Sequence, residues 1–170
     1  MLHINSIDWA PNGDEYHVYA GCHCLFNYTQ KSVVVSATPE EIAAIDYKDP
    51  FFEYATPNQP HDIRIYDDDI GFMNSSGTNE TLKVYLNEGT FEVIHKEDKV
   101  RDYDTRWSKS GWARGMAIQG NKLFVTYTPC ILRVFDIDTC SEIDTMIFST
   151  DCHETPFDIL FDPRDMKEEL

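Results

Sequence analysis

The chain has 170 residues, 42% of them apolar, and is therefore long enough to bury a hydrophobic core. It carries 14 Lys and Arg against 30 Asp and Glu, which gives a formal net charge of −16. An acidic surface repels phosphate backbones, so the composition argues against nucleic-acid binding. No stretch is long and apolar enough to cross a membrane and the first residues lack a signal-peptide pattern, so we expect a cytoplasmic protein that binds no membrane.

Four segments of the chain resemble one another, and the first three each begin a pattern of short strands. After each come a turn, an aromatic-rich strand, a third strand, a second turn and a fourth strand. Repeated four-stranded units are typical of a β-propeller, in which no blade can bury its own faces. Matching Ile7, Ile65, Ile118 and Phe161 gives spacings of 58, 53 and 43 residues, and we expect these side chains to be buried equivalents. The segments are His3–Ile7, His61–Ile65, Arg114–Ile118 and Phe157–Phe161.

The pattern therefore predicts an all-β fold, a partial β-propeller of about three four-stranded antiparallel blades plus the first strand of a fourth. Turn residues stand between β-branched and aromatic runs, as short hairpins require. We expect Phe124, Val134 and Phe148 to pack between blades. The predicted division is blade 1 at about 3–37, an insertion at 38–60, blade 2 at about 61–95, an insertion at 96–111, blade 3 at about 112–149 and the start of blade 4 at about 153–165.

The two insertions account for the longer spacings. Thr38-Pro39-Glu40-Glu41 combines a cap residue, a proline at the first helical position and a glutamate that can close a capping box, so we expect one short helix over Glu40–Ile45. Asp49–Pro60 and Lys96–Gly111 are predicted to be long loops. Such loops often form a binding surface, and the alternative is that they wrap the rim of the propeller.

The cysteine pattern does not predict a metal site. Cys22 and Cys24 flank His23, but strand alternation would place the two thiols on one face and the imidazole on the other. We expect buried or half-buried thiols instead. Asp67-Asp68-Asp69 lacks the rest of a calcium-binding loop and is predicted to be a hairpin turn.

Two features support a secretory location as the alternative to the cytoplasm. Glycosylation sequons begin at Asn27, Asn74 and Asn79. The final residues, Lys167–Leu170, resemble an endoplasmic-reticulum retention signal.

Three blades and one strand fall short of a closed ring, since closed propellers have about four to eight blades. Each end of such an arc would expose an apolar blade face, which soluble monomers avoid. We therefore expect self-association or a partner chain that completes the ring. Two such arcs of three blades each would form a six-bladed ring.

The predicted channel mouth gathers the candidate site residues. Innermost strands line the channel of a propeller, and equivalent positions at their starts converge on one mouth. Imidazole, guanidinium and amide groups there form an anion or metal pocket, or they instead bond the loops of the neighbouring blade. The sequence requires no cofactor, although a divalent metal is compatible with it, and no metal ligands are assigned. The candidate ligand-binding residues are His3, Asn5, His61, Asp62, Trp112, Arg114, His153 and Asp158.

Short motifs at these positions resemble known propellers. Leu2–Asp8 resembles the His-x-Asn-Ser segment of arylsulfotransferase-like six-bladed propellers, and Pro156–Ile159 is similar to the strand entry of NHL-type blades. Trp112–Met116, followed by Lys122–Val125, resembles uncharacterised bacterial propeller proteins. The sulfotransferase resemblance implies His3 as the catalytic candidate that carries the sulfuryl group, with Arg114 as anion support. The chain is much shorter than those enzymes.

The predicted fold and channel mouth are compatible with two functions. The favoured one is a non-catalytic propeller binding or interaction module that uses its loop surfaces and channel mouth, with a small anionic ligand as one candidate partner. The alternative is a propeller enzyme, either a sulfotransferase-like transferase or a gluconolactonase-like hydrolase, with an anion- or metal-binding pocket at the mouth. A gluconolactonase-like metal would need carboxylates and an amide such as those of Asp62, Asp158 and Asn5.

Overall fold

A computed structural model describes residues 4–38, 40–41, 56–98, 111–128, 130–148 and 159. These residues form three four-stranded antiparallel sheets, which confirms the predicted all-β partial propeller. Blade 1 contains β1 (Ile4–Trp9), β2 (Glu15–Tyr19), β3 (Cys24–Asn27) and β4 (Ser32–Ser36). Blade 2 contains β5 (Pro60–Ile65), β6 (Ile70–Ser75), β7 (Glu80–Tyr85) and β8 (Thr90–Lys96). Blade 3 contains β9 (Ala113–Gln119), β10 (Lys122–Tyr127), β11 (Ile131–Asp136) and β12 (Glu142–Ile147).

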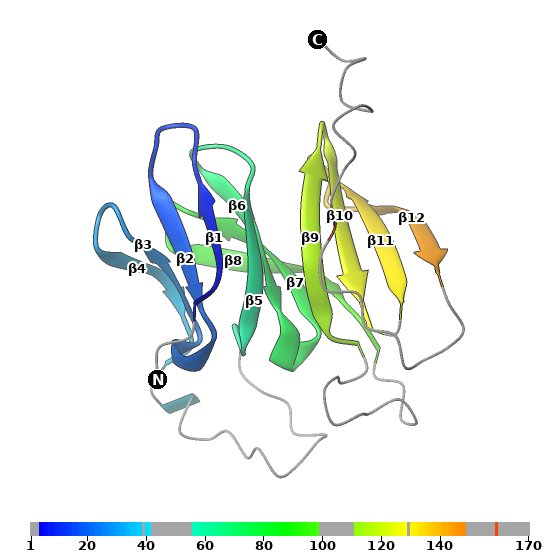
Figure 1. The fold of residues 1–170 in the computed structure, drawn as a ribbon, viewed down its shortest axis with the longest axis horizontal. Coiled ribbons are helices and arrows are strands. Elements are labelled where there is room, and N and C mark those ends of the chain that lie inside the picture. The colour runs from blue at the N-terminus through cyan, green and yellow to red at the C-terminus, as the bar shows by residue number, and fades with distance from the viewer. Residues whose placement is uncertain are drawn as a thin grey trace.

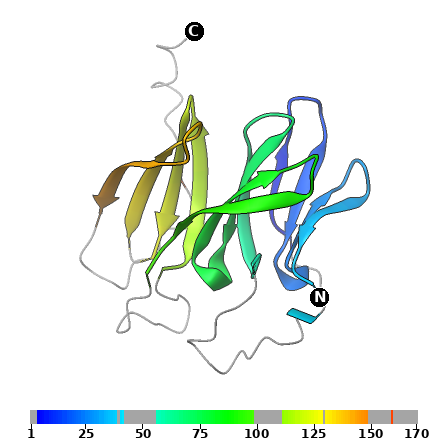
Figure 2. The ribbon, with the colours of Figure 1, turned by 180° about the vertical axis from the view of Figure 1, so that it is seen from behind.

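The strands of each blade follow chain order from the inside to the outside. β5 contacts both β1 and β9, so the first strands of the three blades line one common face (Figure 1). Figure 2, seen from behind, shows the outer strands β4, β8 and β12 away from that face. The starts of β5 and β9 therefore lie at the same end of the inner wall.

Blades 1 and 2 share a detail of their connections that supports the repeat. A single 3-10 turn joins the second strand to the third in each, η1 (Ala20–Cys22) and η2 (Ser76–Thr78). Each turn ends at a residue with positive φ, His23 at 51° and Asn79 at 61°. Asparagine and histidine adopt this left-handed conformation more readily than most residues do.

The core lies between the blades, in two clusters. One cluster joins blades 1 and 2 and includes Val18, Leu25 and Met73. The other joins blades 2 and 3 and includes Phe72 and Leu123, among others. Because successive side chains of a strand point to opposite faces, the neighbours Phe72 and Met73 of β6 supply different clusters. Blade 2 thus buries both of its faces.

The expectation that four equivalent residues are all buried is wrong for Ile7, which is 39% exposed. Its neighbours Ser6 and Asp8 face blade 2, so alternation turns Ile7 to the opposite side of blade 1. Ile65 and Ile118 are partly buried against the clusters. Phe161 lies outside the described residues.

The predicted interblade packing of blade 3 is wrong for Phe148. Phe148 is 58% exposed rather than buried between blades. Phe124 and Val134 are register partners. They lie on the face opposite Leu123 and Val125, which fill the cluster with blade 2. Phe124 and Val134 therefore belong to the face of blade 3 that turns away from the other two blades.

The capping box predicted at the start of the first insertion is present. The Glu41 carboxylate accepts a hydrogen bond from the Thr38 backbone N–H at 2.7 Å, and the Thr38 hydroxyl accepts one from the Glu41 N–H at 3.2 Å. These bonds lower the pKa of the Glu41 carboxyl. Glu40 and Glu41 are helical, and the rest of the predicted helix lies outside the described residues.

Candidate functional site

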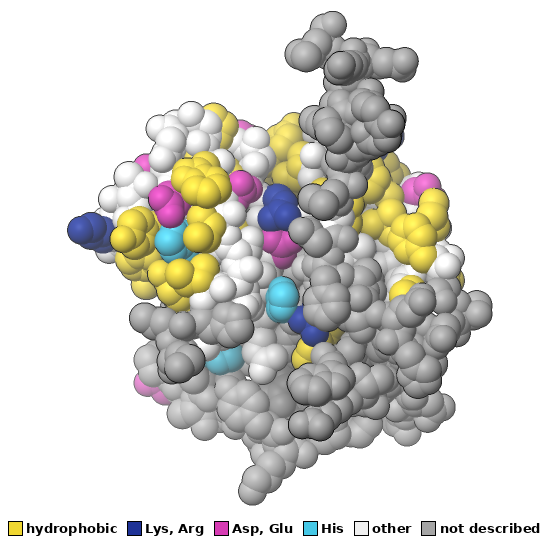
Figure 3. Space-filling model, viewed as in Figure 1, with side chains coloured by type: hydrophobic (Ala, Val, Ile, Leu, Met, Phe, Trp, Pro, Cys, Tyr) yellow, Lys and Arg dark blue, Asp and Glu magenta, His cyan; other side chains and the backbone are white. Residues whose placement is uncertain are grey.

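The inner wall formed by β1, β5 and β9 carries the candidate residues that the structure describes. Figure 3 shows Lys or Arg and His side chains in the middle of this face, between hydrophobic groups over blade 1 at the left and blade 3 at the right. Five of the eight candidates belong to the described part: Asn5, His61, Asp62, Trp112 and Arg114. His3, His153 and Asp158 lie outside the described residues.

His61 and Arg114 meet at the boundary between blades 2 and 3. The Arg114 Nη1 donates to the His61 Nε2 at 2.7 Å, which requires a neutral imidazole with its proton on Nδ1. The Arg114 Cζ lies 4.3 Å from the ring centre of Trp112, within cation–π range. Three residues from two inner strands and one entry loop therefore form one cluster, which we call the mouth cluster.

Arg114 stays charged in this cluster although its side chain is buried. The residue is 6% exposed, and burial lowers the pKa of its guanidinium to about 10. At neutral pH this still leaves a full positive charge. A desolvated cation is electrostatically stronger than one in water, so it attracts an anionic group that reaches it.

The position of Arg114 is fixed through the backbone of β9. Asn74 Nδ2 donates to the Arg114 carbonyl at 3.1 Å, and the Ser76 hydroxyl donates to the Ala113 carbonyl at 2.6 Å. The Thr81 and Tyr127 hydroxyls bond each other in the same buried seam, and burial raises the pKa of Tyr127. These polar residues of blade 2 hold the strand that carries the guanidinium.

Asp62 joins three blades. Its Oδ1 accepts hydrogen bonds from the Ser6 hydroxyl at 2.8 Å and the Arg64 Nη1 at 2.6 Å, and its Oδ2 accepts one from the Met116 N–H at 2.9 Å. The Ile63 N–H donates to Oδ1 as well, at 2.9 Å. Both carboxylate oxygens accept hydrogen bonds within the protein. Bonding to neighbouring blades, the alternative to ligand binding, therefore describes Asp62 better.

Asn5 and Asp8 make similar bonds between blades 1 and 2. Asn5 Nδ2 donates to the Pro60 carbonyl at 2.9 Å. Asp8 Oδ2 accepts a hydrogen bond from the Ile65 N–H at 2.7 Å. Asp8 is not among the site residues predicted from the sequence. The recurrence of aspartate on the inner strands, at Asp8 and Asp62, could have indicated it.

The side chains of the cysteine and histidine run of blade 1 lie in different environments. Cys24 is buried, and burial raises the pKa of its thiol to about 11. Cys22 is exposed, which contradicts the expected burial because it lies in a 3-10 turn instead of a strand. His23 is buried and its Nδ1 accepts a hydrogen bond from the Gln59 N–H at 3.0 Å. Within the described ranges no group of three His, Cys, Asp or Glu is placed to hold a metal ion.

The three sequons are buried in the fold. Asn27, Asn74 and Asn79 are each at most 3% exposed. Their side chains are not accessible to glycosylation in the folded chain. In the described part of the chain, no helix is both long and apolar enough to cross a membrane.

The exposed hydrophobic residues concentrate on the two end blades. Ten large hydrophobic side chains of the described residues are exposed, and one of them, Val93, belongs to blade 2. The other nine belong to blades 1 and 3 and their adjoining turns, in agreement with the two yellow areas of Figure 3. They are Ile4, Ile7, Trp9, Tyr28, Val33, Ile143, Met146, Ile147 and Phe148.

Comparisons with known proteins identify the fold. No family model and no curated protein sequence matches the chain. Among solved structures, the RRP9 WD40 repeats align with 89% of this chain and 40% of their own at 10% identity and a TM-score of 0.58. The Cps50 (Swd1) β-propeller domain of Myceliophteria thermophila aligns with 86% of this chain and 45% of its own at 11% identity and a TM-score of 0.53. The computationally designed Ika4 protein aligns with 95% and 81% at 10% identity and a TM-score of 0.57.

These likenesses concern the fold alone, because the identities are low. The chain spans less than half the length of the two natural propellers. The narrower resemblance to arylsulfotransferase-like or NHL-type propellers is not confirmed by these structures. The chain folds as part of a β-propeller, similar to WD40-type domains.

Proposed function

We propose that this chain is a non-catalytic propeller interaction module whose two end blades receive the blades of a second copy of the chain. The observation that carries the proposal is the unequal burial of the three blades. Blade 2 packs a cluster on each face, whereas blades 1 and 3 each contribute to one cluster. The remaining face of each end blade has the apolar character of an interblade core, and contiguous exposed apolar patches mark interaction sites.

The open face of blade 1 carries an aromatic group. Strand alternation places Ile7, Trp9 and Phe26 on the face opposite Val18 and Leu25. On the same side, His17 stacks on Tyr28 with ring centres 4.8 Å apart and the rings nearly parallel. Glu15 bonds the far side of the His17 ring at 2.5 Å. This face therefore offers flat apolar area with its polar atoms already engaged.

The open face of blade 3 carries exposed aliphatic area. Leu132 pairs with Met146 on the side away from blade 2, and Met146 is 50% exposed. Stacking this face on the open face of blade 1 in another copy would repeat the sheet-on-sheet packing seen twice within the chain. The contact would be heterologous, because it joins two different surfaces, and such contacts close into a ring when the rotation allows.

The mouth cluster of His61, Trp112 and Arg114 supplies the ligand side of the proposal. A carboxylate or phosphate group that reaches it meets a buried cation, which the His61 imidazole and the Trp112 ring hold in place. We therefore propose a small anionic group as the ligand of the channel mouth. The enzyme alternative has no comparable observation in its favour.

The experiment is light scattering of the pure chain with three matched variants. Trp9→Lys and Met146→Lys place a charge on one open face each, and Val93→Lys does the same at an exposed position of blade 2. We expect the wild type and Val93→Lys to associate and the two end-blade variants to lose association. Mixing Trp9→Lys with Met146→Lys should restore part of it, since each retains the face that the other lacks. A monomeric wild type would contradict the proposal, as would equal behaviour of all three variants.

A further inference from the structure

A cavity of about 420 Å³ lies at the outer side of the seam between blades 1 and 2. Its wall on one side is the β3–β4 hairpin, and on the other side it is the β7–β8 turn of 86–89. The ring of Tyr16, with Val34 and Leu86, forms its apolar part. The volume is within the range of about 300–1,000 Å³ that ligand sites occupy. This cavity is separate from the channel mouth, since none of its lining residues belongs to the mouth cluster.

The lining favours positive charge. It contains one charged side chain, Glu88, and no basic one. Asp14 lies directly behind the wall, where its Oδ2 accepts hydrogen bonds from Asn27 Nδ2 at 2.9 Å and Gln30 Nε2 at 2.7 Å. Asn87 Nδ2 bonds the Asp69 carboxylate in the same way. One turn of blade 1 and two turns of blade 2 thus place carboxylates around the cavity.

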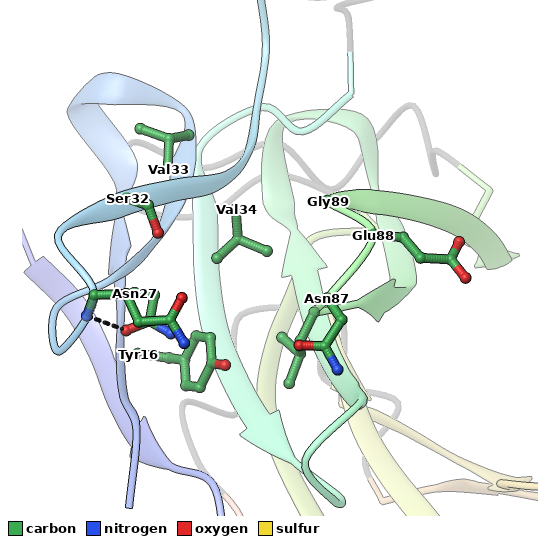
Figure 4. A pocket seen from close by; sticks show the side chains of 10 residues that line it. Tyr16, Asn27, Ser32, Val33, Val34, Asn87, Glu88 and Gly89 are labelled. Atoms are coloured by element: carbon green, nitrogen blue, oxygen red, sulfur yellow. Dashed lines mark hydrogen bonds between the residues drawn. The ribbon is translucent and has the colours of Figure 1, made fainter.

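The orientation of the Asn87 amide group also favours a cationic ligand. Because carboxylates outside the cavity engage the amide nitrogen of Asn87, the oxygen of that carboxamide is left toward the interior. Figure 4 shows this oxygen and the Tyr16 hydroxyl on facing sides of the cavity, with the Ser32 hydroxyl also directed inward. A donor placed between them would meet oxygen atoms on several sides.

The surroundings of Tyr16 agree with a negative potential. The residue is 2% exposed, and burial raises the pKa of its hydroxyl. Asp14 and Asp68 add to this rise, and a hydrogen bond with the Asn27 side chain opposes it. The hydroxyl therefore stays protonated at neutral pH and can both accept and donate a hydrogen bond. An anionic ligand would be repelled here, whereas the net charge of −16 attracts basic partners over a longer range.

We propose that this cavity binds a basic side chain, the guanidinium of arginine or the ammonium of lysine, presented by an exposed segment of a partner protein. The charged head lies between the Tyr16 hydroxyl and the Asn87 oxygen, with Glu88 at the rim. This site is independent of ring completion, so either proposal can fail without the other.

The test is nuclear magnetic resonance titration with two peptides that differ in charge alone. Acetyl-Gly-Arg-Gly-amide should shift the backbone amide signals of 32–34 and 87–89. The peptide with citrulline in place of arginine, which has the same shape without the charge, should bind about tenfold more weakly or worse. Equal binding of the two peptides, or shifts confined to other regions, would overturn the proposal.

Two charge-matched variants separate the cavity from general attraction to an acidic protein. Glu88→Lys and Asp138→Lys both make the net charge two units more positive at exposed turn positions, but Asp138 belongs to the β11–β12 turn of blade 3. We expect Glu88→Lys to weaken binding by about tenfold or more and Asp138→Lys to change it less than about twofold. Ser32→Trp should fill the cavity and abolish binding without any change of charge. Equal weakening by both lysine variants would show that the attraction is not local.

Discussion

Arg133 of blade 3 holds Glu97 of blade 2 through two parallel hydrogen bonds. Arg133 Nε lies 2.5 Å from Glu97 Oε2, and Nη2 lies 3.0 Å from Oε1. His95 adds a contact of 3.3 Å to the same carboxylate, while Arg133 Nη1 also bonds both oxygens of Glu142 at 2.9 Å. A single guanidinium thus links two neighbouring blades and two strands of one blade.

This contact predicts acid sensitivity of the seam between blades 2 and 3. Burial alone would raise the pKa of Glu97, but the hydrogen bonds from His95 and Arg133 outweigh it and lower the pKa from 4.5 to about 2. A depressed carboxyl pKa stabilises the fold above pH 4.5, and this stability is lost as the pH falls toward 2. At about 1.4 kcal/mol per pH unit, it amounts to about 3 kcal/mol at neutral pH.

Urea unfolding of the wild type and Glu97→Gln at pH 7, 4.5 and 2.5 checks this. The difference in unfolding free energy between the two proteins should be large at pH 7 and shrink as the pH falls. The exposed residue Glu88, changed to Gln, serves as the control and should show little difference at any pH. A Glu97→Gln difference that stays constant down to pH 2.5 would contradict the assigned pKa.

Phe72 and Phe124 should respond differently to truncation. Phe72 is fully buried between blades 2 and 3, so Phe72→Ala should cost about 3–5 kcal/mol of unfolding free energy. Phe124 is only half-buried, so Phe124→Ala should cost clearly less. Denaturant unfolding at low protein concentration measures both. At protein concentrations where the chain associates, Phe124→Ala should lower the unfolding free energy more than it does at low concentration. An unchanged loss would count against docking at the face of blade 3.

The mouth cluster should bind phosphate in a manner that depends on Arg114. Arg114→Ala removes the buried cation, and Arg114→Lys keeps the charge but loses the planar fork that stacks on Trp112. We expect phosphate binding, followed by titration of the Trp112 fluorescence and by thermal unfolding, to be abolished by the first change and weakened by the second. His61→Ala removes the acceptor that positions the Arg114 Nη1, so it should also weaken binding. Lys122→Ala, at an exposed position, is the control that should leave binding intact.

Gly89 should resist substitution for a reason that Gly13 does not share. Both have positive φ, 67° and 90°, so alanine carries backbone strain at either position. A Cβ at Gly89 would lie 2.9 Å from the Val34 carbonyl oxygen across the blade 1–2 seam, whereas a Cβ at Gly13 would meet nothing within 4 Å. Gly89→Ala should therefore lower the unfolding free energy by about 1 kcal/mol or more beyond the loss from Gly13→Ala. Equal losses in thermal or urea unfolding would mean that the turn moves aside without cost.

Local chemistry was sufficient to predict the strands, the turns and the capping box. Period-two runs of β-branched and aromatic residues, separated by Gly, Asn and Asp, specify short antiparallel strands whatever surrounds them. The Thr38 and Glu41 bonds likewise depend on residues three positions apart. Such features involve contacts between near neighbours in the chain, so their energies can be judged from the sequence.

Only the tertiary structure decided which faces are covered and which polar residues meet. Alternation assigns Ile7 and Asp8 to opposite faces of β1, but in a propeller both faces of a blade are apolar, so the pattern does not tell which one a neighbouring blade covers. In the same way, the sequence placed His61 and Arg114 in equivalent slots, with Asp62 next to His61. The packing of β5 against β1 and β9 made Asp62 a bond between blades and set Arg114 beside His61 and Trp112. These outcomes depend on the relative placement of residues more than 50 positions apart, which no local propensity encodes.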